Sequence, residues 1–295
     1  MRKSLIARLI AALVLAFAAI APASARTPRP ALWAVSDPDT TIYLFGTIHL
    51  LPEKYAWSSA RLDQAVAGSQ QLVVETIVDD KDPGKMMAAL SSLAFSPGLP
   101  PLSQRVPADK RAALNAAIAK SGLPPTAFDR METWAAAFML LGTQFKDMGL
   151  KSVEGVETVL RKRFLSDGKN IGELETNIEQ LAFFDQLSEK AQRDLLEGAI
   201  SPSGDMTKQF GGMLSAWARG DVDAIARSFN RDLAASPELR DALLKRRNAN
   251  WSKWIEQRMA KPGTLLVAVG AGHLAGSDSV VEMLRRGGLK VRRIQ

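Results

Sequence analysis

The chain has 295 residues, of which 46% are hydrophobic and 23% are charged, and this balance excludes an intrinsically disordered chain and a multi-span membrane protein. It contains no cysteine, so disulfides and thiolate metal sites are excluded, and any metal must be held by histidine, aspartate or glutamate. Its short basic runs are typical of solvated helix faces rather than of a nucleic-acid-binding module. We therefore expect no nucleic-acid partner.

The first 25 residues have the layout of a secretory signal peptide. A basic start precedes an apolar run over 9–21, and small residues at 23–25 form an A-x-A cleavage site. That run is short for a helix that must cross a hydrocarbon core about 30 Å thick. We expect cleavage near Ala25, export to the periplasm or the medium, and a mature form that does not span a membrane. The formal charge would fall from +7 to +4, because the leader holds three cations and no acid.

Apolar patterns near the start predict three strands and a helix. Runs at 32–35 and 41–45 flank a short polar turn, which predicts a β-hairpin. Residues 58–67 carry one apolar face and stop at Gly68, which predicts a helix. A short buried strand is predicted over 71–75.

The middle of the chain, from about 79 to 261, is rich in alanine and methionine and has helical periodicity. We expect helices over 108–121, 128–145, 154–166, 177–198, 205–219 and 236–260. A short strand is compatible with residues 170–174. No low-complexity linker marks a boundary, so we expect a helical insert within a single domain over 26–295.

The end of the chain repeats the plan of its beginning. A buried strand over 264–269 is followed by a turn, a helix over 277–286 and a closing strand over 289–294. Both copies are strand–turn–helix–strand units, and a crossover helix implies parallel strands. The sequence thus predicts a mixed α/β fold with a central sheet built from two strand–GxxH–helix–strand halves on either side of the insert.

The only two histidines occupy matching positions in these halves. Gly46-Thr47-Ile48-His49 follows the first strand, and Gly270-Ala271-Gly272-His273 follows the second. Ligands of parallel sheets bind outside the carboxyl ends of the strands, where both histidines and Glu75 are expected. Two imidazoles and one carboxylate could form an open metal site or an acid–base pair.

These segments resemble the TraB/GumN family, which is related to the Tiki metalloproteases and distantly to the erythromycin esterases. The matching segments are 45–52, 73–75, 269–274, the Leu-Glu-Thr of 174–176 with Gln180, and the pair Arg247-Asn248. In many family members the first glutamate is followed by Leu or Met and often a further acid, whereas here Thr76 follows Glu75.

The resemblance implies a hydrolase-like site built from His49, Glu75, Arg247 and His273. In one version His49, Glu75 and His273 hold a divalent cation such as Mn, Co or Zn, and Arg247 binds a substrate carboxylate or a developing oxyanion. In a metal-free version one histidine is a general base oriented by Glu75. We expect a peptide or small ester substrate and no defined protein partner. The alternative is a non-catalytic protein that binds a metal, haem or a peptide.

Overall fold

The computed structural model describes residues 28–78, 83–201, 203–233 and 236–295. The signal peptide expected over 1–25 lies outside these residues. Within the described ranges, no helix is long and apolar enough to cross a membrane.

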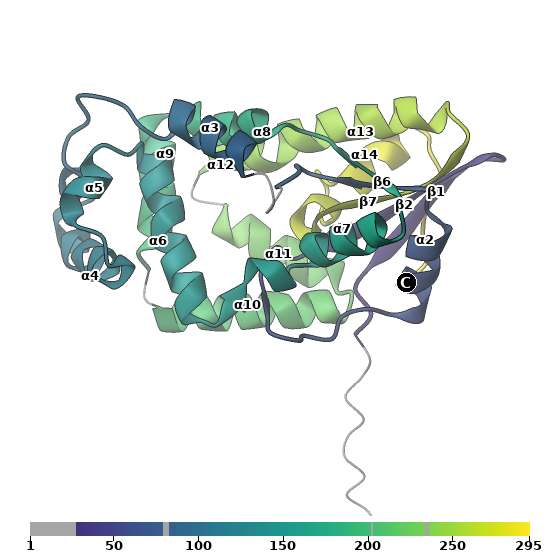
Figure 1. Cartoon of the computed structure of the whole chain (residues 1–295), viewed down its shortest axis with the longest axis horizontal. Coiled ribbons are helices and arrows are strands. Elements are labelled where there is room, and N and C mark those ends of the chain that lie inside the picture. Colours follow the sequence, from purple (N-terminus) through teal and green to yellow (C-terminus); the bar gives the residue numbers. More distant parts are fainter. Residues whose placement is uncertain (1–27, 79–82, 202, 234–235) are drawn as a thin grey trace, which may run out of the picture.

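The fold is mixed α/β, as the sequence predicts, and is organised around a six-stranded sheet of order β6-β4-β7-β2-β1-β8 (Figure 1). The strands are β1 Leu32–Ser36, β2 Thr40–Thr47, β4 Gln71–Val74, β6 Asn170–Glu173, β7 Gly263–Gly270 and β8 Val291–Arg293. The expected hairpin is present, since β1 and β2 pair in antiparallel fashion. Two further short strands, β3 Leu51–Pro52 and β5 Leu150–Lys151, pair separately and were not expected.

The two halves of the repeat interleave in this sheet. The strand β7 lies between β2 and β4 and is parallel to both, so the two strands of the first half are not adjacent. In the second half, β8 pairs with β1 rather than with β7. The strand suggested near 170–174 joins the same sheet as β6, parallel to β4. Four neighbouring parallel strands, β6, β4, β7 and β2, therefore end at one edge.

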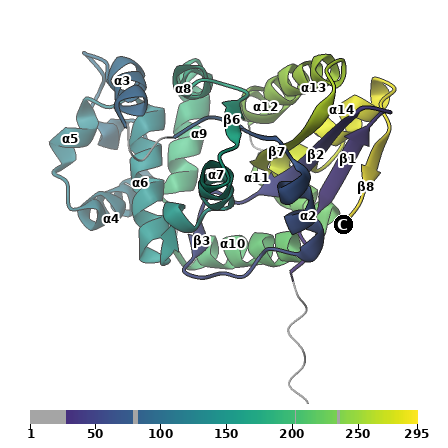
Figure 2. The same ribbon diagram turned by 45° about the vertical axis from the view of Figure 1, so that its right-hand side comes forward.

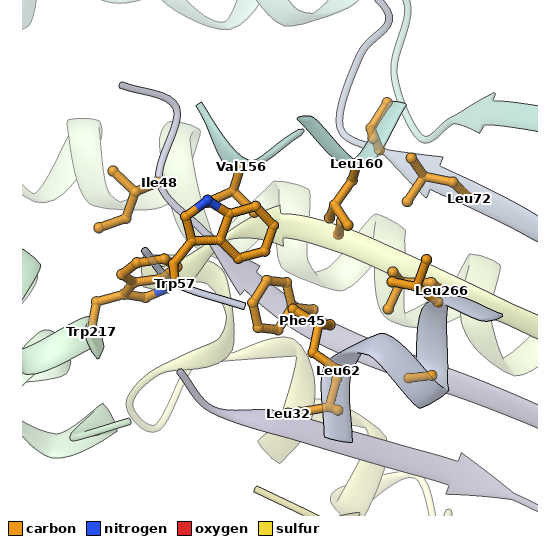
Figure 3. Close-up of a cluster of buried hydrophobic side chains, with 14 of the residues drawn as sticks. Leu32, Phe45, Ile48, Trp57, Leu62, Leu72, Val156, Leu160, Trp217 and Leu266 are labelled. Carbon is orange, nitrogen blue, oxygen red and sulfur yellow. The ribbon is translucent and has the colours of Figure 1, made fainter. Parts of the chain in front are cut away.

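Both faces of the sheet are buried, which explains why its central strands read as continuous apolar runs. Side chains alternate along β7, so Leu266 and Ala268 join one core cluster while Leu265 and Val267 join the other. The first cluster also contains Phe45 stacked against Trp57 at 6.2 Å between ring centroids (Figure 3).

The helices cover these faces and extend the molecule to one side. They are α2 Ala60–Gly68, α3 Gly84–Leu93, α4 Arg111–Ser121, α5 Pro125–Asp129, α6 Thr133–Asp147, α7 Val156–Ser166, α8 Asn177–Asp185, α9 Glu189–Ala199, α10 Ser203–Ala218, α11 Val222–Asp232, α12 Pro237–Arg240, α13 Arg246–Met259 and α14 Val280–Arg286. In both ribbon views α3 to α6 stand away from the sheet (Figure 2). They form a third apolar cluster together with residues of α8 and α9.

Some helix boundaries differ from the sequence prediction. The single helix expected over 128–145 is broken before α6, because Met131 bridges to Phe95 and its carbonyl accepts a hydrogen bond from Arg105. The helix expected over 177–198 is two helices, because Ser188 caps the start of α9. Helices α3 and α11 were not predicted. The helix expected over 236–260 contains a π-helical segment, Asp241–Lys245, between α12 and α13.

A buried tryptophan of α10 ties the helical insert to the end of β2. The indole N–H of Trp217 donates to the carbonyl of Gly46 at 2.7 Å, and its side chain is buried in the first core cluster. We expect Trp217→Phe to lower the free energy of unfolding by about 1–3 kcal/mol, because a buried hydrogen bond and some packing are lost. Urea unfolding measures this change, with the part-exposed Trp254→Phe as control. Equal losses in the two variants would contradict the proposed anchoring role.

Candidate functional site

The two Gly-x-x-His turns leave adjacent parallel strands at the same level. In the register of β2 and β7, Thr47 is opposite Gly270, so both chains turn at one edge of the sheet. The turns pack closely, since a Cβ added at Gly46 would lie 3.1 Å from the Cα of Ala271. An alanine at this position would require the second turn to shift by a few tenths of an ångström, so glycine favours the close packing of the two turns.

Gly270 is bordered by both histidines and by Glu75. A Cβ at this position would lie 3.1 Å from Oε1 of Glu75, 3.5 Å from Nε2 of His49 and 3.6 Å from Cδ2 of His273. The geometry thus brings these three side chains around one point, although His49 and His273 are 224 residues apart in the sequence.

The carboxylate of Glu75 is buried directly after β4. Its Oε1 accepts a hydrogen bond from the amide of Gly270 at 2.7 Å, and its Oε2 accepts one from Nη2 of Arg247 at 2.8 Å. Burial opposes ionisation of this carboxyl, but the imidazoles of His273 and His49, the Arg247 guanidinium and the Gly270 amide together lower its pKa to about 2. Glu75 is therefore a carboxylate at neutral pH.

Arg247 bridges Glu75 to a second buried carboxyl group. Nε of Arg247 donates to both oxygens of Glu175 at 3.0 Å, and Nη2 donates to Oε2 of Glu175 at 2.8 Å. The indole of Trp251 donates to the same Glu175 at 2.9 Å. Burial raises the pKa of Glu175, and the contacts with Arg247 oppose this rise. Arg247 is itself only 5% exposed, so it lies inside the protein and not on its surface.

His273 is buried, and both of its ring nitrogens have partners in the protein. Nε2 lies 3.3 Å from Nη1 of Arg247, and Nδ1 lies 2.6 Å from Oδ1 of Asn248. Because the guanidinium can only donate, Nε2 accepts and Nδ1 carries the proton. The amide of Asn248 donates to the carbonyl of Asp278, which leaves its oxygen facing the ring. Burial lowers the pKa of His273 to about 3, in agreement with a neutral ring.

His49 has a different environment. Its side chain is 62% exposed, and its Nδ1 lies 2.5 Å from Oε2 of Glu157, at the start of α7. The other oxygen of Glu157 accepts from the hydroxyl of Thr47 at 2.7 Å. The charge of Glu157 raises the pKa of His49 to about 9, an effect that the solvent around the ring partly screens. His49 is thus paired with Glu157 rather than with Glu75.

Three of these side chains are placed to hold a cation together. Among the residues that the structure describes, His49, Glu75 and Glu157 each offer one ligand atom, and these atoms lie within 4.8 Å of one another. The same three residues line a cavity of about 300 Å³. His273, which was expected to share a metal with His49 and Glu75, is not part of this group; its Nε2 lies 3.8 Å from Oε1 of Glu75 and 3.3 Å from Nη1 of Arg247.

Glu157 was not among the site residues expected from the sequence. Its side chain is 15% exposed and binds His49 and Thr47. No signal in the sequence distinguished it, because an acid in the first turn of a helix is common for electrostatic reasons alone. Only the packing of α7 beside the first turn, where the amide of Val156 donates to the carbonyl of Ile48, brings it to the site.

Comparison with known proteins identifies relatives over most of the chain. The family described as TraB/PrgY/gumN matches residues 31–293. The chain is 27% identical over 247 residues to the uncharacterized protein YbaP of Escherichia coli (strain K12), covering 82% of this chain and 87% of that one. YbaP of Shigella flexneri matches to the same extent. No solved structure matches.

Removing Arg247 tests how far the two buried carboxylates depend on it. We expect Arg247→Ala to lower the free energy of unfolding by about 3–5 kcal/mol, since Glu75 and Glu175 would lose their common cation. The neighbouring Arg246→Ala serves as control, because it breaks only an exposed pair with Asp241 and should cost about 0–1 kcal/mol. Chemical denaturation measures both. A loss below ~1 kcal/mol for Arg247→Ala would contradict the bridging role.

The lowered pKa of Glu75 predicts a pH dependence of stability. The carboxyl group is ionised down to about pH 2 in the folded chain but only down to its ordinary value of 4.5 when unfolded. Its contribution is therefore complete above pH 4.5 and is lost as the pH falls towards 2. In chelator-treated protein, we expect the stability difference between the wild type and Glu75→Gln to shrink by up to about 3 kcal/mol over this interval. A difference independent of pH would refute the lowered pKa.

Proposed function

Because the chain belongs to the TraB/PrgY/gumN family and brings one imidazole and two carboxylates together at a sheet edge, we propose that it is a metal-dependent hydrolase of peptide or ester bonds. The observation that supports this most is the convergence of His49, Glu75 and Glu157. His49 and Glu75 follow β2 and β4, and Glu157 lies in the first turn of α7. Nothing in the folding of these separate elements requires the three side chains to meet.

The donor set fits a divalent cation of borderline softness. One nitrogen and two carboxylate oxygens suit Zn, Mn or Co and leave further positions for water or substrate. Gly270 keeps the neighbouring space open, since a Cβ there would stand 3.1 Å from Glu75 and 3.5 Å from His49. When bound, such a cation lowers the pKa of a coordinated water and polarises a substrate carbonyl.

The residues around this set hold it in place. Arg247 and the Gly270 amide keep Glu75 ionised and fix its orientation, and the Thr47 hydroxyl orients Glu157 by donating a hydrogen bond to it. In this proposal Glu157 takes the third ligand position that the sequence suggested for His273. His273 instead accepts a hydrogen bond from Arg247 and so acts as a positioning residue.

A metal-free mechanism is the second candidate, and one observation favours it. The 2.5 Å contact with Glu157 raises the pKa of His49 to about 9, so the ring is protonated at neutral pH and can donate a proton, and 62% of its side chain is exposed. The site would then act by proton transfer through His49.

Metal binding and hydrolysis can be tested on residues 26–295. We expect about one Zn, Mn or Co ion per chain by calorimetry and cleavage of peptide or p-nitrophenyl ester substrates. Both His49→Ala and Glu157→Gln should weaken metal binding by at least about 10-fold and lower the activity, because each removes a ligand. Glu53→Gln is the matched control, since Glu53 is an exposed acid paired with Lys151.

The outcomes separate the candidates. Activity that persists with a chelator but is lost in His49→Ala would favour the metal-free mechanism. Tight metal binding without hydrolysis of any substrate would favour a sequestering protein instead. Hydrolysis that survives in His49→Ala would refute the proposed site.

We also propose that the chain is exported, on the basis of the basic start, the apolar run over 9–21 and the A-x-A site. Expression in a bacterium should yield a periplasmic protein whose amino terminus is Arg26. A cytoplasmic protein that retains Met1 would contradict this proposal.

A further inference from the structure

An arginine lies in the same cavity as the proposed metal ligands. The lining of this cavity of about 300 Å³ includes His49, Glu75 and Glu157, and also Arg161. The remaining lining is largely polar and is supplied by Thr76, Ser152, Thr158, Gln180 and Val78. A volume near 300 Å³ is at the lower end of small-ligand pockets, so it accommodates only a short part of a substrate.

Arg161 follows Glu157 by one turn of α7, so the two side chains share a helix face. They do not pair with each other: Glu157 binds His49 and Thr47, whereas Nη1 of Arg161 donates to the carbonyl of Val78. Nε of Arg161 is buried and has no acceptor among the described residues. No carboxylate in the described ranges forms an ion pair with this arginine.

A guanidinium held in this way is suited to an anion with two oxygens. Nε and the nearer Nη group donate along one edge of a planar fork, which matches the spacing of carboxylate oxygens. Buried donors are normally satisfied, and Arg161 lines the cavity with an unsatisfied Nε, so a ligand that binds beside this side chain can supply the missing acceptor.

We propose that Arg161 binds a carboxylate of the substrate, so that this site cleaves bonds that lie one or two residues from a negative charge. The inference rests on the proposed function and names its substrate class. One helical turn is about 5.4 Å, and consecutive residues are about 3.8 Å apart. When the substrate carboxylate binds Arg161, only one or two substrate residues therefore fit between it and the scissile bond beside Glu157.

The reaction is an ordinary hydrolysis and needs only water. The water oxygen forms a bond to the carbonyl carbon, the carbon–nitrogen or carbon–oxygen bond breaks, and the leaving group takes a proton. Arg161 stays protonated throughout and only holds the substrate. The carboxylate can be the terminal group of a peptide or the side chain of an acidic residue.

Binding measurements on the metal-loaded chain test the role of Arg161 directly. We expect N-acetyl-trialanine with a free carboxylate to bind at least about 10-fold more tightly than its carboxyl-terminal amide by calorimetry. Arg161→Gln should abolish this preference, and Arg161→Lys should retain part of it because the charge remains without the fork. Lys162→Gln is the matched control, since it removes a cation from an exposed position of the same helix.

A second pair of probes distinguishes the two sources of the carboxylate. N-acetyl-Ala-Glu-Ala-amide and its Gln counterpart differ only in the side chain, so a preference for Glu that depends on Arg161 assigns the site to acidic side chains. If only the trialanine pair shows a preference for the carboxylate, the site binds the carboxyl-terminal group of a peptide. The inference is overturned if neither pair shows a preference for the carboxylate. It is also overturned if the preference survives in an Arg161→Gln variant that still binds metal with its normal affinity.

The two proposals fail separately. Hydrolysis without any carboxylate preference removes the role of Arg161 and leaves the hydrolase in place. Carboxylate binding that depends on Arg161, in a chain that cleaves neither these peptides nor the p-nitrophenyl esters, supports the subsite and refutes the hydrolase.

Discussion

The site depends on one buried cation that neutralises two buried carboxylates. Arg247 contacts Glu75 and Glu175 at 2.8 Å, and all three side chains are 5–7% exposed. Isolated charges are costly to bury, so such groups are tolerated only when they are paired and hydrogen-bonded. The three residues come from α13, from the end of β4 and from the segment after β6, and the network therefore fixes a helix against the edge of the sheet.

The order of the strands explains why the chemistry lies at this edge. With β7 between β4 and β2, three parallel strands end together, and each is followed by a residue of the site. The glycines at Gly46 and Gly270 allow the turns to approach one another and keep space beside Glu75. The Glu75 carboxylate and the imidazoles of His49 and His273 are thus brought together from segments that are not neighbours in the sequence.

Two identical motifs have acquired opposite electrostatic properties. His273 is buried against Arg247, so its pKa falls to about 3 and its ring is a neutral acceptor. His49 is exposed beside Glu157, so its pKa rises to about 9. The surroundings and not the motif account for this difference. Of the two histidines, His49 lines the cavity with Arg161 and His273 does not.

The sequence by itself determined the mixed α/β class, the hairpin, the helical middle and the matching positions of His49 and His273, because these follow from local periodicity and from the ends of strands. It also singled out Glu75 and, through the family resemblance, Arg247. It missed the breaks near Met131 and Ser188, where a bridge and a cap override helical periodicity. Only the tertiary structure decided that Glu157 joins His49 and that His273 faces Arg247. Those contacts depend on how α7 and α13 pack against the sheet, and packing between distant segments leaves no periodic signal in the chain.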